Sequence, residues 1–325
     1  MPNKGIHAYP PTRLSLPNRR NRGTIASIRT NRLENDVPEL PEVDVARRGI
    51  AEQLLHDPIV GIDLRLPKLI ISADGLGLDQ IVGRSFERVD RHGKYLPIVI
   101  GDIAIVVHLK LSGQIVARGP SIPGFNAGHP VPAYGAELPH KSTHLILDFA
   151  SGARLYLTDI RHFARVQLMP VDDLAGYIGN LRLGPDAVSP EFTREWFHSA
   201  IARRSQARLK PLLLDQTFVA GLGNIYVDEA LHRAALHPER LARDLAAAEI
   251  DRLYDAIGEI LAIAMPIGGA HILNGKAVPE RGAFPFAHGR QGVECLTCGT
   301  PIIKERVNGR GTYRCPVCQP EPVRG

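Results

Sequence analysis

The hydrophobic pattern of this chain changes once, at Pro170, and that change constrains the fold more than any other feature. Before Pro170 the chain contains a series of short β-rich runs, at 59–66, 85–91, 95–100, 103–109, 144–149, 154–158 and 164–169. Turn sequences such as Gly101-Asp102 separate neighbouring runs. Closely spaced strands without intervening helices are typical of a β-sandwich.

After Pro170 the apolar residues recur at helical spacing instead. This spacing predicts helices over 191–202, 224–235 and 244–264, and we expect Gly268-Gly269 to end the last of them. A further helix, over about 41–56, is predicted before the strands because Pro41 suits a first helical turn. The predicted fold class is therefore α+β, with a leading helix, an N-terminal β-sandwich domain and a C-terminal helical domain.

All four cysteines of the chain stand in two C-x2-C pairs near its end: Cys295, Cys298, Cys315 and Cys318. Sixteen residues separate the two pairs, and four thiolates at such spacing are typical of a closed tetrahedral zinc site on a hairpin. The alternative, two redox pairs, lacks the strand-to-helix context of that chemistry. We predict one structural Zn²⁺ in a C-terminal zinc ribbon.

Composition limits the remaining possibilities. The chain has 325 residues, 44% hydrophobic and 22% charged, and no apolar run approaches the roughly 18 residues of a membrane span. The net charge of +5 comes from residues 1–36, which hold seven basic and two acidic residues. We predict five segments: a disordered leader 1–37, the sandwich domain 38–170, a linker 171–188, the helical domain 189–285 and the zinc ribbon 286–320.

Several local features favour contact with nucleic acid. Arg203, Arg204, Arg208 and Lys210 form a run without an acidic residue, and basic residues also lie between the cysteine pairs. The glycine-rich turn 221–226 leads into a helix whose N-terminus could bind phosphate. Each feature has an ordinary alternative, either solvated surface charge or a simple capped helix. Together they favour a DNA-clamping surface.

The motifs of the chain resemble those of the bacterial formamidopyrimidine-DNA glycosylases. The resemblance runs from Pro38 to about Gln319, through PELPEV at 38–43, GKYL at 93–96, HLKLSG at 108–113, TDIRHF at 158–163, LGPDA at 183–187 and GLGNIYVDEAL at 221–231. It implies a bifunctional DNA-repair glycosylase and abasic-site lyase that excises oxidised purines from duplex DNA. It also implies a helix–two-turn–helix element over roughly 211–238.

Carried over position by position, the resemblance implies catalytic roles for Pro38, Glu39, Glu42, Lys94 and Arg310. Pro38 would attack C1′ of the damaged nucleotide and form an iminium, and Glu39 would exchange a proton at the sugar ring oxygen. Glu42 would help to position the site. Lys94 would contact phosphates and assist strand scission. Without the resemblance, Lys94 would be an ordinary edge lysine and the two glutamates ordinary helix-start acids.

The resemblance also implies DNA contacts by Leu111, Arg161, Phe163, Lys210, Asn224 and His129. The first three would fill the hole left by the extruded base. Asn224 and Arg310 would hold phosphates near the lesion. From their pattern alone, Leu111 and Phe163 would instead belong to the core.

The implied chemistry makes one demand on the chain. A proline within a chain has an amide nitrogen that cannot attack, whereas a free terminal amine with a pKa of about 7.7–8 is partly neutral at pH 7. Pro38 must therefore be the first residue of the active enzyme. We hypothesise that translation starts at Val37, through a GTG codon, and that the initiating methionine is then removed.

The chain departs from the family pattern at a few positions, which are Leu111, His162, Ala164, His288 and the segment 268–274. The segment lacks the usual hydroxyl residues and acid of a base-recognition loop, so the departures affect the choice of base more than the backbone chemistry. Leu40 favours the purine-lesion branch over the related endonuclease VIII type. A non-enzymatic binder of damaged DNA and a zinc-ribbon protein with another substrate are the remaining alternatives.

The expected partner is double-stranded damaged DNA. We expect a monomer in the bacterial cytoplasm, associated with the nucleoid, with no membrane contact and no small-molecule cofactor.

Overall fold

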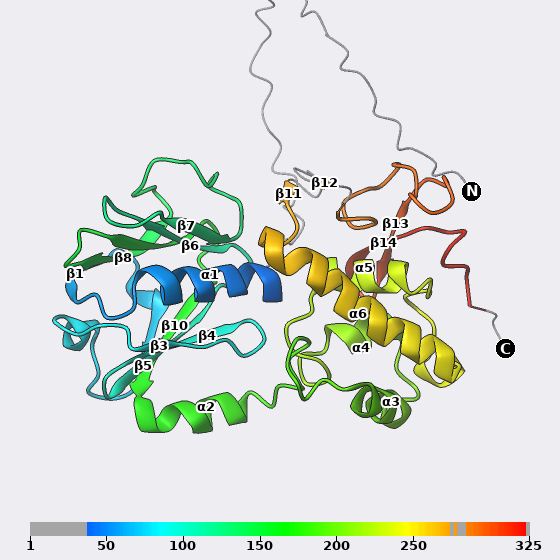
Figure 1. Ribbon diagram of the computed structural model, residues 1–325, viewed down its shortest axis with the longest axis horizontal. Helices are drawn as coiled ribbons and strands as arrows, with labels where there is room; N and C mark the ends of the chain where they lie inside the picture. The colour runs from blue at the N-terminus through cyan, green and yellow to red at the C-terminus, as the bar shows by residue number, and fades with distance from the viewer. Residues whose placement is uncertain (1–37, 274–275, 278–283, 323–325) are drawn as a thin grey trace, which may run out of the picture. The chain divides into compact units, whose positions relative to one another are not determined.

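The computed structural model describes residues 38–273, 276–277 and 284–322, and Val37 lies outside these residues. Helices and strands are mixed as expected for an α+β fold (Figure 1). Within the described part of the chain, we find no helix with the length and apolar character that a bilayer span requires.

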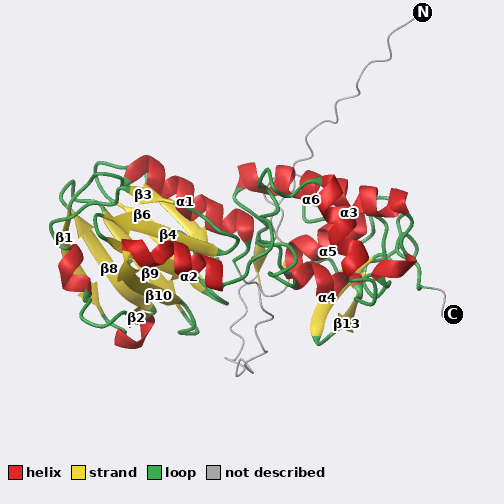
Figure 2. Ribbon diagram, turned by 90° about the horizontal axis from the view of Figure 1, so that it is seen from below, coloured by secondary structure: helices red, strands yellow, loops and turns green. Residues whose placement is uncertain are grey.

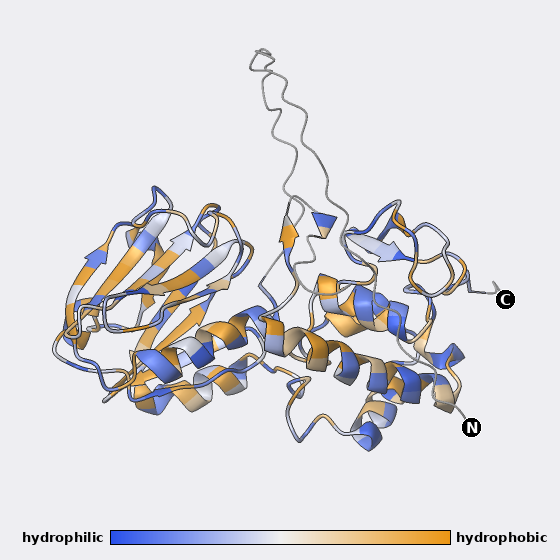
Figure 3. Cartoon of the chain, turned by 45° about the horizontal axis from the view of Figure 1, so that its top comes forward, coloured by the Kyte–Doolittle hydropathy of each residue, from blue (hydrophilic) through white to orange (hydrophobic). Residues whose placement is uncertain are grey.

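The N-terminal region is a sandwich of two five-stranded sheets, as predicted. The first has the order β1-β8-β9-β6-β7, with bounds Ile59–Leu64, Thr143–Phe149, Arg154–Asp159, Gly113–Arg118 and Phe125–Gly128. The second has the order β2-β10-β5-β4-β3, with bounds Ile70–Ser72, Arg165–Pro170, Ile103–His108, Tyr95–Ile100 and Arg88–Val89. Apolar side chains of both sheets share one core, and Figure 3 shows the apolar residues concentrated along these strands.

Helix α1 (Leu40–Gln53) connects the two largest hydrophobic cores among the described residues. Its first residue, Leu40, packs in the core of the helical region, whereas Val43 and Ile50 pack in the sandwich. Gly49 allows this close packing, because a Cβ at Gly49 would lie 2.3 Å from the Phe125 ring in β7. The segment that begins α1 is therefore fixed by both regions.

The C-terminal region contains helices α3 (Arg194–Arg203), α4 (Leu209–Leu214), α5 (Asn224–Arg233) and α6 (Ala247–Ile267). Figure 2 shows these helices grouped together, apart from the strands of the sandwich. Gly268 ends α6 in a left-handed conformation with φ +78°, as predicted from the Gly268-Gly269 pair. The short pair β11 (Ile272–Leu273) and β12 (Lys276–Ala277) follows.

The final hairpin consists of β13 (Ile303–Val307) and β14 (Arg310–Arg314), and β14 packs against α5. Short 3-10 helices complete the described elements, at Pro67–Leu69, Leu78–Ile81, Val171–Asp173 and Ala242–Asp244.

The sequence prediction missed several elements. Strands β2, β6 and β7 were not expected, and the run 85–91 contains only the two-residue strand β3. The interval predicted as a linker, 171–188, contains helix α2 (Leu174–Asn180). Leu174 packs on the outer face of the second sheet, against Val106 and Met169, so this interval is partly structured. The five domain boundaries remain predictions.

Candidate functional site

The carboxylate of Glu39 lies at the N-terminus of α5, although Glu39 itself stands at the start of α1. It accepts hydrogen bonds from the backbone N–H groups of Ile225 (2.9 Å) and Tyr226 (3.4 Å). Residue 223, the N-cap of α5, is a glycine and offers no side-chain cap. Glu39 therefore serves as the cap of a helix 186 residues away in the sequence.

Two glycines make room for this contact. A Cβ at Gly223 would lie 2.3 Å from Cδ of Glu39, and a Cβ at Gly221 would lie 2.5 Å from the Leu40 side chain. Gly221 also has a φ of +97° and accepts a hydrogen bond from the Leu40 N–H. The glycine-rich turn thus receives the first residues of α1 rather than presenting an empty helix N-terminus.

Glu42 joins three segments of the chain through its two carboxylate oxygens. Oε2 accepts the N–H of Glu39 (2.9 Å). Oε1 accepts the hydroxyl of Tyr226 (2.6 Å) and the N–H of Ala270 (3.1 Å). A Cβ at Gly269 would lie 2.0 Å from Oε1, so the residue beside Ala270 must also be small.

The turn between β3 and β4 places Lys94 beside the two glutamates. Asp186 holds this turn, because it forms a buried ion pair with Arg91 and accepts the N–H of Gly93 (2.9 Å). Gly93 packs closely against Ala220, whose Cβ would lie 3.1 Å from an added Cβ. The Lys94 charge lies near enough to Glu39 and Glu42 to alter their ionisation.

Burial shifts the acid–base behaviour of all three groups. It raises the pKa of Glu39, and the nearby Lys94 charge opposes that rise. It raises the pKa of Glu42 to about 7, with a further contribution from the Glu39 charge. Burial also lowers the pKa of Lys94. Such a cluster of shifted groups is typical of a site that moves protons.

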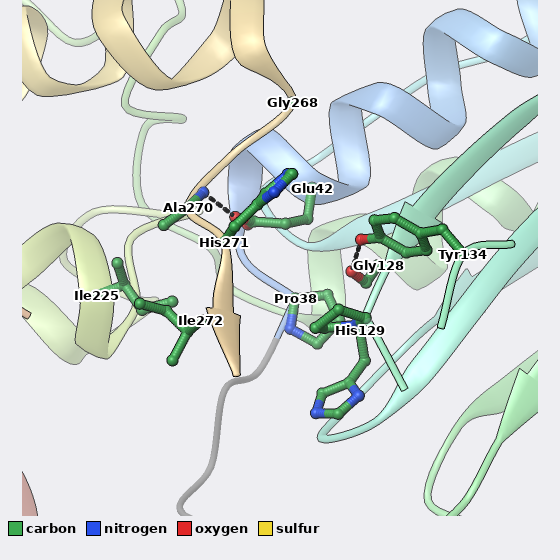
Figure 4. A pocket seen from close by; sticks show the side chains of 11 residues that line it. Pro38, Glu42, Gly128, His129, Tyr134, Ile225, Gly268, Ala270, His271 and Ile272 are labelled. Carbon is green, nitrogen blue, oxygen red and sulfur yellow. Dashed lines mark hydrogen bonds between the residues drawn. The ribbon is translucent and has the colours of Figure 1, made fainter. Parts of the chain in front are cut away.

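Pro38 lines a pocket together with residues from four other parts of the chain (Figure 4). The pocket encloses roughly 360 Å³ of empty space, part of it open to solvent. Its other walls come from Glu42, from the segment 128–134, from Ile225 and from the segment 268–272. His129 and Tyr134 lie on one wall and His271 on another. Burial lowers the pKa of His129.

The tip of the β13–β14 hairpin meets the start of α5. Asn224, the first residue of α5, does not cap the helix, and its Nδ2 donates to the carbonyl of Gly311 (3.0 Å). Its Oδ1 is buried and has no hydrogen-bond partner among the described residues. The neighbouring Arg310 is exposed, and its charge lowers the pKa of Lys94 in addition to the effect of burial.

Lys210, which was predicted to contact DNA, is buried in this structure, and its contact with DNA remains a prediction. The side chain is fully buried, and Nζ donates to Asp228 (2.6 Å), to Thr312 Oγ1 (2.8 Å) and to the Gly311 carbonyl (3.0 Å). These contacts use all three protons of the ammonium group. Lys210 therefore supports the hairpin that carries Arg310.

Two loops of the sandwich meet at the buried Asp159. Its carboxylate accepts the hydroxyl of Ser112 from the β5–β6 loop, and it also accepts three backbone N–H groups, those of Arg161 (3.0 Å), Phe163 (2.6 Å) and Ala164 (2.7 Å). The predicted wedge residues stand on these loops. Phe163 is 44% exposed, so it does not belong to the core, and its ring lies 5.2 Å from the Arg161 guanidinium carbon. Leu111 is half-buried.

The four cysteines form one cluster in which all sulfur atoms lie within 4.8 Å of one another. Two of the pairs are separated by 3.9 Å (Cys295 to Cys318) and 3.4 Å (Cys298 to Cys315). Tetrahedral Zn–S bonds of about 2.3 Å require similar sulfur separations. The residues present therefore fit a single structural Zn²⁺, as predicted.

Comparison with known proteins assigns each of the three regions to the family that the sequence motifs resemble. The N-terminal domain model of formamidopyrimidine-DNA glycosylase matches residues 37–166, its H2TH domain model matches 183–274, and a zinc finger found in FPG and IleRS matches 292–320. The formamidopyrimidine-DNA glycosylase of Pelotomaculum thermopropionicum is 40% identical over 87% of this chain and 99% of its own length. The chain belongs to the formamidopyrimidine-DNA glycosylase family. It is therefore a DNA-repair enzyme with glycosylase and AP lyase activity.

Solved structures of this family have the same fold. Lactococcus lactis FPG in complex with Fapy-dG DNA has a TM-score of 0.74 and 32% identity, over 87% of this chain and all of that one. MutM in complex with DNA containing carbocyclic 8-oxo-G has a TM-score of 0.73 and 33% identity, with the same coverage. Family membership confirms the predicted fold class and excludes the non-enzymatic alternative.

The structure brings together most of the glycosylase residues predicted from the motifs. Pro38, Glu39, Glu42 and Lys94 surround one site, and Asn224 and Arg310 adjoin it. Leu111, Arg161 and Phe163 lie on two loops joined by Asp159. Their individual roles remain predictions.

Sequence reasoning assigned no role to Tyr226, Asp186 or Asp159. Each lies within a quoted motif, but the partners that reveal its role are distant in the sequence. Of the predicted base-recognition segment 268–274, residues 268–273 are described and Asn274 lies outside the described residues.

Proposed function

We propose that the enzyme excises oxidised purines, 8-oxoguanine and formamidopyrimidines, from duplex DNA and then cleaves the abasic strand. The observation that carries this proposal is the position of Pro38 in the wall of a pocket that also contains Glu42, directly beside the buried Glu39. The bound Fapy-dG and 8-oxo-G of the solved relatives support the choice of bases.

In the first step the Pro38 nitrogen attacks C1′ with its lone pair, and the glycosidic bond breaks with its electrons leaving on the base. The nitrogen then loses its proton, which restores its lone pair, and the departing base takes up a proton. Glu39 then gives a proton to the ring oxygen O4′ as the C1′–O4′ bond opens and the nitrogen lone pair forms the iminium. A raised pKa suits this role, because it keeps a proton on Glu39 nearer neutral pH. The iminium then accepts electrons as the C2′ proton leaves and the 3′ phosphate departs. A second elimination releases the 5′ phosphate.

The surrounding cations would bind the phosphates during these eliminations. Lys94 supplies positive charge near Glu39, Arg310 lies near Lys94, and Asn224 adds an amide at the start of α5. Leu111, Arg161 and Phe163 would enter the duplex where the damaged nucleotide has left it. We place His129 among the DNA contacts because it lines the Pro38 pocket.

This mechanism requires a free amine on Pro38, and we therefore propose that Pro38 is the first residue of the active molecule. N-terminal sequencing and intact mass of natively expressed protein test this requirement. A working enzyme in which Pro38 remains in a peptide bond would refute the mechanism.

The central experiment is borohydride trapping on a duplex with a single abasic site. The wild-type enzyme should form a covalent adduct, whereas Pro38→Gly, or a form that retains residues 1–37, should form little or none. Pro41→Ala is the matched control, since Pro41 lies in the first turn of α1 and supplies no amine. Trapping that survives in Pro38→Gly at the wild-type level would contradict the proposal.

The endonuclease VIII type of activity, on oxidised pyrimidines, is tested on paired duplexes. We expect faster excision of 8-oxoguanine than of thymine glycol. The reverse order would move the enzyme to the pyrimidine branch without affecting the role of Pro38.

A further inference from the structure

The hydroxyl of Tyr226 occupies a junction that the proposed chemistry does not use directly. Tyr226 is fully buried in α5, and its ring stacks on Phe284 at 6.3 Å. Its hydroxyl donates to Glu42 Oε1 (2.6 Å) and accepts the N–H of Ala270 (3.0 Å). One oxygen atom thus connects α5, the start of α1 and the segment that follows α6.

The segment held by this hydroxyl is a wall of the Pro38 pocket. Ala270, His271 and Ile272 all line the pocket, and the Ala270–Glu42 hydrogen bond is visible in Figure 4. Gly268 and Gly269 precede them with φ values of +78° and +104°. Two consecutive glycines give this segment unusual backbone freedom, so its position depends on the contacts that hold it.

The opposite wall is fixed independently by side chains of β6. Gln114 donates to the carbonyls of His129 (2.8 Å) and Pro132 (2.9 Å), and Arg118 donates to the carbonyl of Tyr134 (2.7 Å). The Tyr134 and His271 rings meet edge to face across the pocket, 6.5 Å apart. The width of the pocket therefore depends on where the 270–272 segment lies, because the 129–134 segment is held in place.

We propose that Tyr226 is a positioning residue for base excision, whose hydroxyl holds the 270–272 segment against Glu42 and so sets the wall of the pocket that faces the damaged base. This inference rests on the proposed function, in which Pro38 attacks the sugar that carries that base. An abasic nucleotide has no base to hold. Loss of the hydroxyl should therefore slow base excision and spare strand cleavage at an abasic site.

The test compares Tyr226→Phe with the wild-type enzyme on two duplexes, one with 8-oxoguanine and one with a preformed abasic site. We expect the single-turnover excision rate to fall about tenfold or more, since a buried hydrogen bond to an acidic group is lost, and abasic nicking to change by less than about twofold. A general loss of folding would lower both rates together. Tyr254→Phe is the matched control, because it removes a tyrosine hydroxyl bond to a backbone carbonyl (Phe192, 3.0 Å) in the same helical region.

A second variant keeps the test decisive if Tyr226→Phe does not fold. Ala270→Gly leaves Tyr226 and Glu42 intact but places three glycines in succession at 268–270, and it should also slow excision selectively. Equal losses on both duplexes, or no loss beyond that of Tyr254→Phe, would overturn the inference. If the wild-type enzyme neither traps nor excises, the proposed function itself fails, which is a different result from wild-type activity that Tyr226→Phe leaves unchanged.

Discussion

Replacing Gly223 with alanine should displace the carboxylate of Glu39 without changing any group that takes part in the chemistry. The added Cβ would lie 2.3 Å from Cδ and 2.4 Å from Oε1 of Glu39. Ordinary carbon contacts are roughly 3.5–4.0 Å, so the carboxylate must retreat by about 1 Å. The backbone of residue 223 is extended, with φ −136°, so alanine adds no conformational strain of its own.

The size of the effect follows from this displacement. A shift of about 1 Å at a catalytic group costs on the order of a hundredfold in rate, and overpacking a buried site costs roughly 1–3 kcal/mol of stability. Because Glu39 acts on the sugar, both base excision and abasic nicking should fall by about a hundredfold. This result would differ from the selective loss expected for Tyr226→Phe.

The assay measures both single-turnover rates alongside thermal unfolding. Gly258→Ala is the matched control, because Gly258 lies exposed in α6 with no atom within 4 Å of an added Cβ. That control should keep both rates, and its free energy of unfolding should rise by up to about 1 kcal/mol because alanine has a better helix propensity than glycine. The reasoning is refuted if folded Gly223→Ala has rates within about twofold of Gly258→Ala, because the carboxylate would then tolerate the displacement.

Four further predictions concern charge and metal. The pKa of Glu42 is raised from 4.5 to about 7, so its contribution to stability is present below pH 4.5 and is lost as the pH rises through 7. Between pH 4.5 and 8, the free energy of unfolding of the wild-type enzyme, measured by chemical denaturation, should fall by roughly 2–3 kcal/mol relative to that of Glu42→Gln. Parallel curves of unfolding free energy against pH for the two proteins would contradict this. Lys210→Met should lower stability by roughly 3–5 kcal/mol, since it removes the buried ammonium group that pairs with Asp228, yet leave the salt dependence of DNA binding unchanged. Arg310→Met should instead reduce the salt slope by about one, as measured by fluorescence anisotropy. Metal analysis should find one zinc per chain, and its removal by a chelator should abolish DNA binding, whereas retained binding would separate the ribbon from the interface.

Much of the fold was accessible from the sequence because the informative signals are local. Strand β4 was predicted with its exact bounds, and the end of α6 followed from a glycine that adopts a left-handed conformation. Strands β6 and β7 were missed because glycine and polar residues interrupt their apolar pattern, even though the fold buries Gln114. That glutamine is buried in order to hold a loop that follows β7.

The candidate site was harder to predict, because its partners are distant in the sequence. A lysine in a basic run resembles a phosphate ligand. The hydrogen bond from Lys210 to the carbonyl of Gly311, 101 residues later in the chain, shows that the side chain points into the protein. The glycine-rich turn at 221–226 likewise suggests an anion site, but the group that it binds is the Glu39 carboxyl group of the same chain. In both cases the role of the residue depends on its burial and on a partner far away in the sequence. Neither property can be inferred from the spacing of residues in the sequence.

The capping of α5 by Glu39 also has a consequence for protein synthesis. The ribosome makes Glu39 early, but the backbone groups that orient its carboxylate are added 186 residues later. A nascent chain that has not yet released α5 from the exit tunnel therefore carries the acid without its binding partner. The Glu39 site is therefore complete only after the second half of the molecule has emerged.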